Sequence, residues 1–334
     1  MKKIGYLGMG AWGYCLASLL ASKEEHELIC WTTKPDLAKH LTETREHPLL
    51  PGHKSKGKMT FTTNMAEAIQ DVEMIVESVT SAGLRSVFKQ MHGLNLAHCP
   101  VVLTSKGIEQ NTGDILPEVA VEILGETFRP LIGFLSGPSF ATEVIRGLPT
   151  SVVGTGYSTD VIQDICKTFT TPSFRIYPNT DIMGVAFGGA LKNIIGIACG
   201  ISEGLALGNS SKAALMTRGL HEIRKLAIAC GCKPDTLNGL AGMGDLCVTC
   251  SSPISRNFRF GLLLAQGLSS AQAQEKIGMV VEGAYTTISA LQLSKQHKVE
   301  MPIAETVYNI IENHIHPLDA VRALMRRTIK EEHL

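Results

Sequence analysis

The sequence has no excess of charge of either sign. Its 334 residues include 31 lysines and arginines and 31 aspartates and glutamates, so the formal net charge is zero. A neutral total argues against a broad basic surface, and we expect no nucleic-acid partner. With 19% charged and 44% hydrophobic residues, the composition is that of a globular protein long enough for two ordinary domains.

Long apolar runs and a disulfide framework are also missing. No run reaches 18 apolar residues, so we predict no membrane span. The first apolar stretch ends at Leu7 and is followed at once by Gly8 and Gly10, which predicts no signal peptide. The nine cysteines are odd in number and scattered through apolar segments. They indicate reduced, buried thiols in a cytoplasmic protein.

Short apolar runs alternate with helical patterns in the first half of the chain. Strands are predicted at Ile4–Leu7, Glu27–Trp31, Met74–Val76, Pro100–Leu103, Leu131–Leu135, Ser151–Val153 and Phe174–Tyr177. Helices are predicted between them, as at Trp12–Ser22, Ala82–Met91 and Thr112–Leu124. This alternation predicts an α/β, Rossmann-type domain with a largely parallel sheet. Residues 47–58, rich in Pro, Gly and Lys, are predicted to form a surface loop.

From about residue 180 onward the patterns are helical only. Examples are Ala213–Cys230, Phe260–Gln266 and Tyr285–Gln296. We therefore predict a dinucleotide-binding domain over residues 1–180 and an all-α, substrate-binding domain over residues 181–334.

The segment Gly8–Gly13 fits the pattern G-x-G-x-x-G. Alone this pattern is weak, and an ordinary turn before a helix would also fit it. Here it follows a predicted strand and precedes a predicted helix, and a second strand ends near residue 31, as in a dinucleotide-binding unit. One glycine allows the tight turn, one lets the backbone approach the pyrophosphate, and one lets the helix pack on the strand. The pyrophosphate would bind the N–H groups at the helix N-terminus.

The end of the second strand indicates which dinucleotide binds. NAD sites usually carry Asp or Glu there, whereas this chain has Cys30–Lys34 without an acid. Thr33 and Lys34 are predicted to hold a 2′-phosphate, so we expect NADP(H) to be preferred, with NAD(H) as the alternative cofactor. The competing interpretation is that Lys34 is only a solvated residue before Pro35.

A row of glycines with a four-residue spacing surrounds a lysine. Its members are Gly184, Gly188, Gly196, Gly200, Gly204 and Gly208, and Lys192 occupies the missing place. Each glycine inside a helix costs about 1 kcal/mol relative to alanine, so the row needs a reason. Close helix packing is one, and we expect it for the distal glycines. Because burying an ammonium group is costly, Lys192 itself is predicted to point toward a ligand.

Several motifs together resemble one family. They are Gly8–Gly13, Ser105–Glu109, Leu135–Ala141, Gly188–Asn193, Gly242–Leu246, Ser255–Asn257 and Val280–Gly283. In this order and spacing, they make the chain similar to the bacterial-type NAD(P)-dependent sn-glycerol-3-phosphate dehydrogenases. The resemblance implies reversible hydride transfer between NAD(P)H and dihydroxyacetone phosphate. The product, sn-glycerol 3-phosphate, would supply phospholipid synthesis.

The resemblance also implies roles for particular residues. Lys192 would exchange the proton at C2, with Lys106 and Asp245 beside it. The implied substrate-binding residues are Lys106, Gly137, Ser139, Lys192, Asn193, Asp245, Ser255, Arg256 and Asn257. The implied cofactor-binding residues are Gly8, Gly10, Ala11, Trp12, Gly13, Thr33, Lys34, Lys106, Ala141, Arg256, Val280 and Glu282. Asp245 could either orient a lysine or bind a substrate hydroxyl.

The chemistry agrees with these roles. Oxidising a secondary alcohol needs a base, and a lysine serves only if its pKa falls toward neutrality. Burial and a nearby cation both lower it, and we expect Lys106 and Arg256 to be that cation. Charge-assisted donors such as Arg256 suit a substrate phosphate. The chain departs from the family pattern at Ser78–Ser81, where a proline is usual, and at Ala11, where serine is common.

Other interpretations compete with this one. Cys230-x-Cys232 and Cys247-x-x-Cys250 could suggest zinc, but the first spacing is short for a zinc hook, and we predict no metal. A related two-domain reductase for another small hydroxy acid would share the architecture. A catalytically silent NADP-binding redox sensor would be expected to lack Lys192 and Lys106. The glycine-rich helical domain could also pack as a homodimer.

Overall fold

The structure is a computed structural model, and it describes residues 1–94, 96–110, 112–312, 314–329 and 331–332. The chain divides into two compact units. The first consists of Met1–Ser105 and Leu116–Ile182, and the second of Lys106–Ile115 and Met183–Leu334. Residues 106–115 were assigned to the first domain from sequence, but they belong to the second unit although they lie between two elements of the first.

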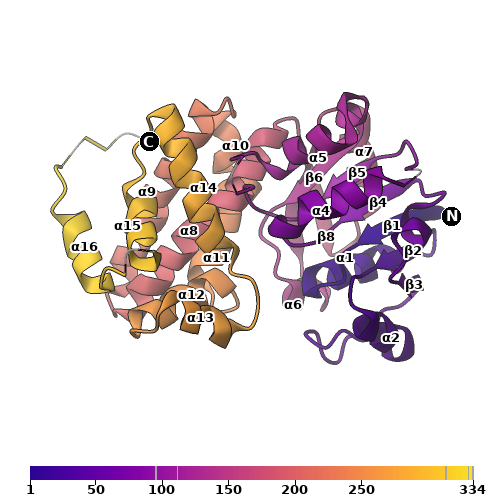
Figure 1. Cartoon of the computed structure of the whole chain (residues 1–334), viewed down its shortest axis with the longest axis horizontal. Helices are drawn as coiled ribbons and strands as arrows, with labels where there is room; N and C mark the ends of the chain where they lie inside the picture. Colours follow the sequence, from indigo (N-terminus) through magenta and orange to yellow (C-terminus); the bar gives the residue numbers. More distant parts are fainter. Residues whose placement is uncertain (95, 111, 313, 330, 333–334) are drawn as a thin grey trace. The chain divides into compact units, whose positions relative to one another are not determined.

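The first unit contains an eight-stranded sheet (Figure 1). Its strands are β1 (Lys2–Leu7), β2 (His26–Trp31), β3 (Lys58–Thr62), β4 (Met74–Glu77), β5 (Val101–Leu103), β6 (Ile132–Ser136), β7 (Thr150–Gly156) and β8 (Phe174–Asn179). The spatial order is β3-β2-β1-β4-β5-β6-β7-β8. Neighbours run parallel except β6 and β7, which are antiparallel. The prediction of a Rossmann-type, largely parallel sheet is confirmed.

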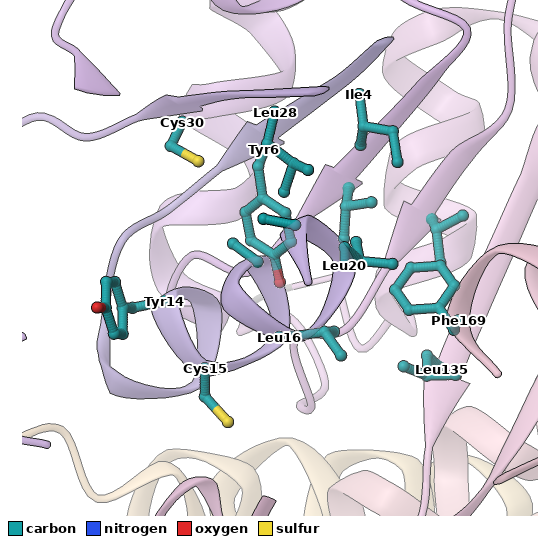
Figure 2. Close-up of a cluster of buried hydrophobic side chains, with 14 of the residues drawn as sticks. Ile4, Tyr6, Tyr14, Cys15, Leu16, Leu20, Leu28, Cys30, Leu135 and Phe169 are labelled. Atoms are coloured by element: carbon teal, nitrogen blue, oxygen red, sulfur yellow. The ribbon is translucent and has the colours of Figure 1, made fainter. Parts of the chain in front are cut away.

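Helices cover both faces of this sheet, which explains why its central strands are apolar without alternation. They are α1 (Ala11–Ala21), α2 (Pro35–Thr44), α3 (Met65–Ile69), α4 (Ser81–His92), α5 (Leu116–Leu124), the 3₁₀ helix η1 (Glu126–Leu131), α6 (Ala141–Val144) and α7 (Thr159–Phe169). Figure 2 shows the core cluster on one face, where Leu16 and Leu20 of α1 meet Tyr6 and Leu28 of the sheet and Phe169 of α7.

The predicted surface loop at residues 47–58 is more closely packed than its composition indicates. His47 and Leu50 are buried, with 3% and 2% of their surface exposed. The Tyr14 hydroxyl of α1 donates to the Arg45 carbonyl and accepts from the Ser55 amide, so both ends of the loop are tied to α1. The strand β3 that follows the loop was not predicted, because it is a partly exposed edge strand whose residues alternate with polar ones and form no continuous apolar run.

The second unit is helical, as predicted. Its elements are α8 (Ile182–Gly204), α9 (Gly208–Ala229), α10 (Pro234–Asn238), the π-helix η2 (Leu240–Gly244), α11 (Asp245–Ser251), α12 (Arg256–Ala265), α13 (Ser270–Ile277), α14 (Glu282–His297), α15 (Pro302–Ile311) and α16 (Pro317–Met325). By length and a mean hydropathy of 1.6, α8 could cross a membrane. However, 94% of that apolar window is buried inside the protein, as in the central helix of a helical domain.

The glycine row on α8 is a packing seam. A Cβ atom on Gly188 would lie 2.6 Å from the Ala241 carbonyl oxygen of η2, and one on Gly196 would lie 2.9 Å from Thr249 of α11. On Gly200 it would lie 2.0 Å from the Phe258 oxygen of α12. The glycines on both sides of Lys192 therefore face neighbouring helices, not an open slot as expected from sequence. Because these glycines pack within the unit, they give no support to a homodimer, which stays a prediction.

Candidate active site

The three glycines of the Gly8–Gly13 loop have three different environments. Gly8 has a φ of +102°, and a Cβ there would lie 2.6 Å from the Ser78 carbonyl oxygen. A Cβ on Gly13 would lie 2.0 Å from the Gly8 oxygen. Around Gly10, by contrast, no described atom lies within 4 Å of that position. A tight turn, a close helix contact and an open approach are what a dinucleotide pyrophosphate site requires.

The N-terminus of α1 is suited to an anion. Gly10 is its N-cap and makes no side-chain capping bond, and the first turn contains no acidic residue. Ala11 and Trp12 begin the helix and are half-buried. The unpaired N–H groups and the positive end of the helix dipole thus remain available to a pyrophosphate. The residues present fit a dinucleotide cofactor.

His47 supports this loop and was not found from the sequence. The Leu49 amide donates to His47 Nδ1 at 3.1 Å, so the ring proton is on Nε2, which lies 3.1 Å from the Met9 carbonyl oxygen. Burial lowers the pKa of His47, which keeps this neutral tautomer. The histidine thereby fixes the middle of the glycine loop. Its position in a Pro- and Gly-rich segment gave no signal of this role.

Thr33 and Lys34 follow β2 and are exposed. Lys34 is the N-cap of α2, and its amide bonds to Thr32 Oγ1 at 3.3 Å. The turn is therefore held by Thr32, while the two predicted side chains extend into solvent.

A second predicted group of residues follows β6 in the same unit. Gly137 has a φ of +149°, and a Cβ there would lie 2.9 Å from Val152 Cα. The Ser139 hydroxyl donates to the Gly137 carbonyl at 3.0 Å. Ala141 begins α6, and its carbonyl accepts from Cys15 Sγ of α1 at 3.4 Å. Ala141 is thus brought beside α1, the helix that begins at the glycine loop.

The second unit assembles a cluster of two lysines around one carboxylate. Lys192 Nζ lies 2.5 Å from Asp245 Oδ1, and Lys106 Nζ lies 2.6 Å from Asp245 Oδ2. Lys192 also donates to Thr249 Oγ1 at 2.7 Å. The Asp245 side chain is 1% exposed and that of Lys192 10%, whereas Lys106 is 20% exposed. Lys106 is thus the more accessible of the two ammonium groups.

The surroundings of Lys192 set its protonation. Burial, together with the positive charge of Lys106, lowers the pKa of Lys192 to about 8, while the negative charge of Asp245 acts in the opposite direction. A lysine with this pKa can gain and lose a proton near neutral pH, which general acid–base catalysis requires. Arg256 was also expected in this cluster, but its charged neighbours are Glu282 and Arg259.

The position of Asp245 depends on local backbone geometry. It is the first residue of α11 and directly follows the π-helix η2, a rare turn often found at functional sites. Inside η2, a Cβ on Gly242 would lie 2.0 Å from the Leu237 carbonyl oxygen, so the turn requires glycine there. Thr249 was not predicted. It lies four residues after Asp245, on the same face of α11, and this spacing was a usable signal.

The three predicted residues at the start of α12 differ in environment. Ser255 is the N-cap and accepts from the Phe258 amide at 3.3 Å. Asn257 is buried; its Nδ2 donates to Asn193 Oδ1 and its Oδ1 accepts from the Gly283 amide, both at 2.9 Å. Arg256 is exposed. Asn257 therefore connects α8, α12 and α14, and Arg256 is the side chain of the three that extends outward.

The last predicted cofactor residues lie at the start of α14. Val280 is 37% exposed, and Glu282, the first residue of the helix, is half-buried and interacts electrostatically with Arg256. The structure thus brings Glu282 and Arg256 together within the second unit.

No metal-binding group emerges from the part of the chain that the structure describes. Those residues contain no cluster of three or more His, Cys, Asp or Glu side chains able to hold a metal ion. None of the nine cysteines, all of which lie in the described residues, forms a disulfide. Cys232 and Cys250 are buried, and burial raises the pKa of the half-buried Cys230 and Cys247.

Comparisons with known proteins agree along the whole chain. A family model described as NAD-dependent glycerol-3-phosphate dehydrogenase N-terminus matches residues 3–161, and one described as its C-terminus matches residues 181–322. A glycerol-3-phosphate dehydrogenase of Protochlamydia amoebophila is 79% identical over 334 residues, covering all of both chains. That of Chlamydia pneumoniae is 55% identical over 333 residues, covering 100% of this chain and 99% of the relative.

A solved structure shows the same similarity. The crystal structure of glycerol-3-phosphate dehydrogenase (gpsA) from Coxiella burnetii superimposes with a TM-score of 0.92 at 34% identity. The match covers 98% of this chain and 99% of that one.

Proposed function

The chain belongs to the NAD-dependent glycerol-3-phosphate dehydrogenase family, and from this premise we propose how its residues carry the reaction. The reaction is reversible hydride transfer between NAD(P)H and dihydroxyacetone phosphate, giving sn-glycerol 3-phosphate. Both curated relatives carry NAD(P)+ in their names. When bound at the glycine loop, the dinucleotide supplies or accepts the hydride.

The cluster of Lys192, Asp245 and Lys106 carries the proposal. In the reducing direction, protonated Lys192 donates its proton to the C2 oxygen of dihydroxyacetone phosphate as the hydride arrives at C2. In the oxidising direction, neutral Lys192 takes the hydroxyl proton as the hydride leaves. The buried ammonium, with a pKa lowered to about 8, is suited to both directions.

Asp245 orients the lysines in this proposal. Each of its two oxygens already accepts from one ammonium group, which favours orientation over binding a substrate hydroxyl. Thr249 accepts a further bond from Lys192 and restricts its Nζ position. Lys106, the more accessible lysine, would contact the substrate and the nicotinamide as well as lower the pKa of its neighbour.

The substrate phosphate would bind at the N-terminus of α12. Arg256 is exposed there, its guanidinium is a bidentate phosphate donor, and the helix N-terminus adds backbone donors. Ser255, Asn257 and Asn193 would shape this site from behind, since their side chains are engaged within the protein. Gly137 and Ser139 remain proposed substrate contacts.

For the cofactor, we propose that NADP(H) is preferred. The support is that Thr33 and Lys34 are exposed and that no acidic residue stands at residues 32–34. NAD(H) is the second cofactor. The glycine loop with Ala11 and Trp12 would bind the pyrophosphate, and Ala141, Arg256, Val280 and Glu282 are further proposed contacts. We place the enzyme in the cytoplasm, where glycerol 3-phosphate enters phospholipid synthesis.

One assay tests the function directly. Purified protein is mixed with dihydroxyacetone phosphate and NADPH, and the absorbance of the reduced nicotinamide is followed. We expect oxidation that depends on both substrates. Oxidation no faster than in a protein-free control would refute the activity, and an equal rate with non-phosphorylated dihydroxyacetone would refute the phosphate site at Arg256.

A further inference from the structure

A buried glutamate ends the central strand β4, and the reaction described above does not use it. Glu77 is 0% exposed. It lies at the carboxyl end of the parallel strands, the edge where dinucleotides bind. The next residue, Ser78, has the carbonyl oxygen against which Gly8 of the glycine loop packs. The loop that follows this glutamate therefore packs against the predicted cofactor site of the first unit.

The short contacts around this carboxyl group can be compared with the protons available to form them. Glu77 Oε1 accepts from the Val79 amide at 2.6 Å. The Ser105 hydroxyl lies 2.6 Å from the same Oε1 and 2.5 Å from the Val79 carbonyl oxygen. The Ser105 hydroxyl has one proton for these two oxygens, and the carbonyl has none to give. An ionised Glu77 leaves the two oxygens to share that proton, whereas a protonated Glu77 supplies a second proton and satisfies both contacts.

The other carboxyl oxygen supports the same conclusion. Glu77 Oε2 is buried and has no hydrogen-bond partner among the described residues. Burying an ionised oxygen without a hydrogen bond costs far more free energy than burying a neutral one. No described residue forms an ion pair with Glu77, and burial raises its pKa to about 7.

Three hydroxyl groups also connect the loop after β4 with the loop after β5. Thr104 Oγ1 donates to the Glu77 carbonyl at 2.9 Å, Ser78 Oγ lies 2.6 Å from Thr104 Oγ1, and the Tyr6 hydroxyl lies 2.8 Å from Ser78 Oγ. The loop after β4 is thus tied to the end of β5 through both the main chain and the side chain of Glu77.

The neighbouring ionisable groups do not balance a negative charge at Glu77. Burial raises the pKa of Tyr6 on β1, Cys15 on α1 and Cys30 on β2, so these groups are neutral at pH 7. α3, α4 and α5 carry the other ionisable groups, which are half-buried or exposed: Glu67, Arg85, Lys89, His92, Glu118 and Glu122. Within this second set, Arg85 binds Glu122 through two hydrogen bonds of 2.9 and 2.6 Å.

We propose that Glu77 is a positioning residue for the dinucleotide and that it acts in its protonated form. Neutral Glu77 holds the loop after β4 against the end of β5, behind Gly8. Ionised Glu77 would break the bond to Ser105 or Val79 and add a buried negative charge behind the site of the anionic pyrophosphate. Dinucleotide binding is therefore coupled to proton uptake. The inference rests on the proposed cofactor site.

The coupling has a defined size. If binding raises the pKa of Glu77 by one unit from about 7, about 0.5 proton is taken up per dinucleotide at pH 7.5. The Kd would rise up to about tenfold as the pH increases through this range. At pH 5.5 the carboxyl is already protonated in the unbound protein, so the uptake should vanish.

The test is calorimetric titration of the full chain with NADH at pH 7.5 and 5.5, in two buffers of different ionisation enthalpy. NADH is used because the 2′-phosphate of NADPH itself titrates near pH 6. Glu77→Gln mimics the neutral acid and should bind NADH with the uptake reduced by about 0.5 proton. Because Lys192 and His47 are unchanged in this variant, the difference from the unmodified protein isolates Glu77.

Glu222→Gln is the matched control. Glu222 is also buried, burial raises its pKa to about 7, and it accepts from the Ile303 and Ala304 amides in the second unit. This variant should keep the full uptake. Equal uptake in the unmodified protein and Glu77→Gln, or binding by the unmodified protein without uptake, would overturn the inference alone. Absence of NADH binding would overturn the proposed cofactor site. If Glu77→Gln does not fold, Ser105→Ala is used instead: losing the Ser105 hydroxyl should raise the pKa of Glu77 in the unbound protein and so reduce the uptake at pH 7.5, and an unchanged uptake would overturn the inference.

Discussion

Lys192 and Thr249 share a hydrogen bond of 2.7 Å across two helices that pack through a glycine. The same lysine contacts Asp245 at 2.5 Å. Two oxygens therefore hold Nζ in one place, and the third ammonium proton remains for the substrate.

Replacing Lys192 by alanine should remove the proton carrier. We expect kcat to fall by at least about 100-fold, the low end of general acid–base contributions, with NADPH affinity little changed. Steady-state kinetics and a binding titration measure both quantities. Lys212→Ala is the control, because Lys212 is also a partly buried lysine paired with a carboxylate, Glu203 at 2.5 Å, and should leave kcat unchanged. Near-normal kcat in the Lys192 variant would rule out its role.

The pH dependence should differ between the two directions of the reaction. Reduction needs protonated Lys192, so its kcat/KM should fall as the pH rises through about 8. Oxidation needs neutral Lys192 and should rise up to about pH 8 and then level off. Profiles with the same sign in both directions would contradict this assignment.

Substitutions at Lys106 and Thr249 should shift the midpoint of these pH profiles in opposite directions. Lys106→Met removes a neighbouring cation and leaves Asp245 to Lys192 alone, so the pKa of Lys192 and the midpoint should rise. Thr249→Val removes an acceptor of the ammonium group, so the midpoint should fall, and Thr249→Ser should restore it. Shifts of the same sign in both variants would show that these contacts do not set the pKa of Lys192.

Lys34→Ala should weaken NADPH selectively. A charge-assisted bond to the 2′-phosphate contributes about 1.5–3 kcal/mol, so kcat/KM for NADPH should fall about tenfold or more while that for NADH is unchanged. Lys39→Ala is the control, since Lys39 is exposed on the same helix α2. Equal losses with both dinucleotides, or a better kcat/KM with NADH in the unmodified protein, would count against NADP preference.

Gly200→Ala tests the packing seam. In an exposed helix this change would stabilise by up to about 1 kcal/mol, but here the new Cβ would lie 2.0 Å from the Phe258 oxygen. We expect a loss of about 1–3 kcal/mol in the free energy of unfolding, measured by denaturant titration. Gly93→Ala, whose Cβ would lie 3.5 Å from the Gln90 oxygen, should change it by less than about 0.5 kcal/mol.

The sequence predicted those parts of the molecule whose structure is determined by residues near one another in the chain. The glycine loop could be predicted because each of Gly8, Gly10 and Gly13 serves a neighbouring turn or helix end. Short apolar runs predicted the strands, except the partly exposed edge strand β3. The glycine row marked α8, but the residues that Gly188, Gly196 and Gly200 contact lie 53 to 58 positions later in the chain and could not be inferred from spacing.

The parts that sequence missed depend on distant partners. His47 reaches back to Met9 from a segment whose composition resembles an exposed loop. Orientation of a lysine by Asp245 was one of two alternatives that the family resemblance left open, because the pairing of both its oxygens with lysines joins residues 53 and 139 positions away. Glu77 appears in the sequence only as the polar end of an apolar run, and its protonation follows from the positions of Ser105 and Val79.

The placement of residues 106–115 in the second unit has a consequence for modular engineering. A gene cut once near codon 180 would give a helical fragment that lacks Lys106 and a sheet fragment that carries it away from Asp245. Recombining halves from two relatives at that point would therefore pair a lysine from one parent with a carboxylate from the other. A functional chimera needs three crossovers, so that the ten-residue insert is inherited together with the helices that hold its lysine.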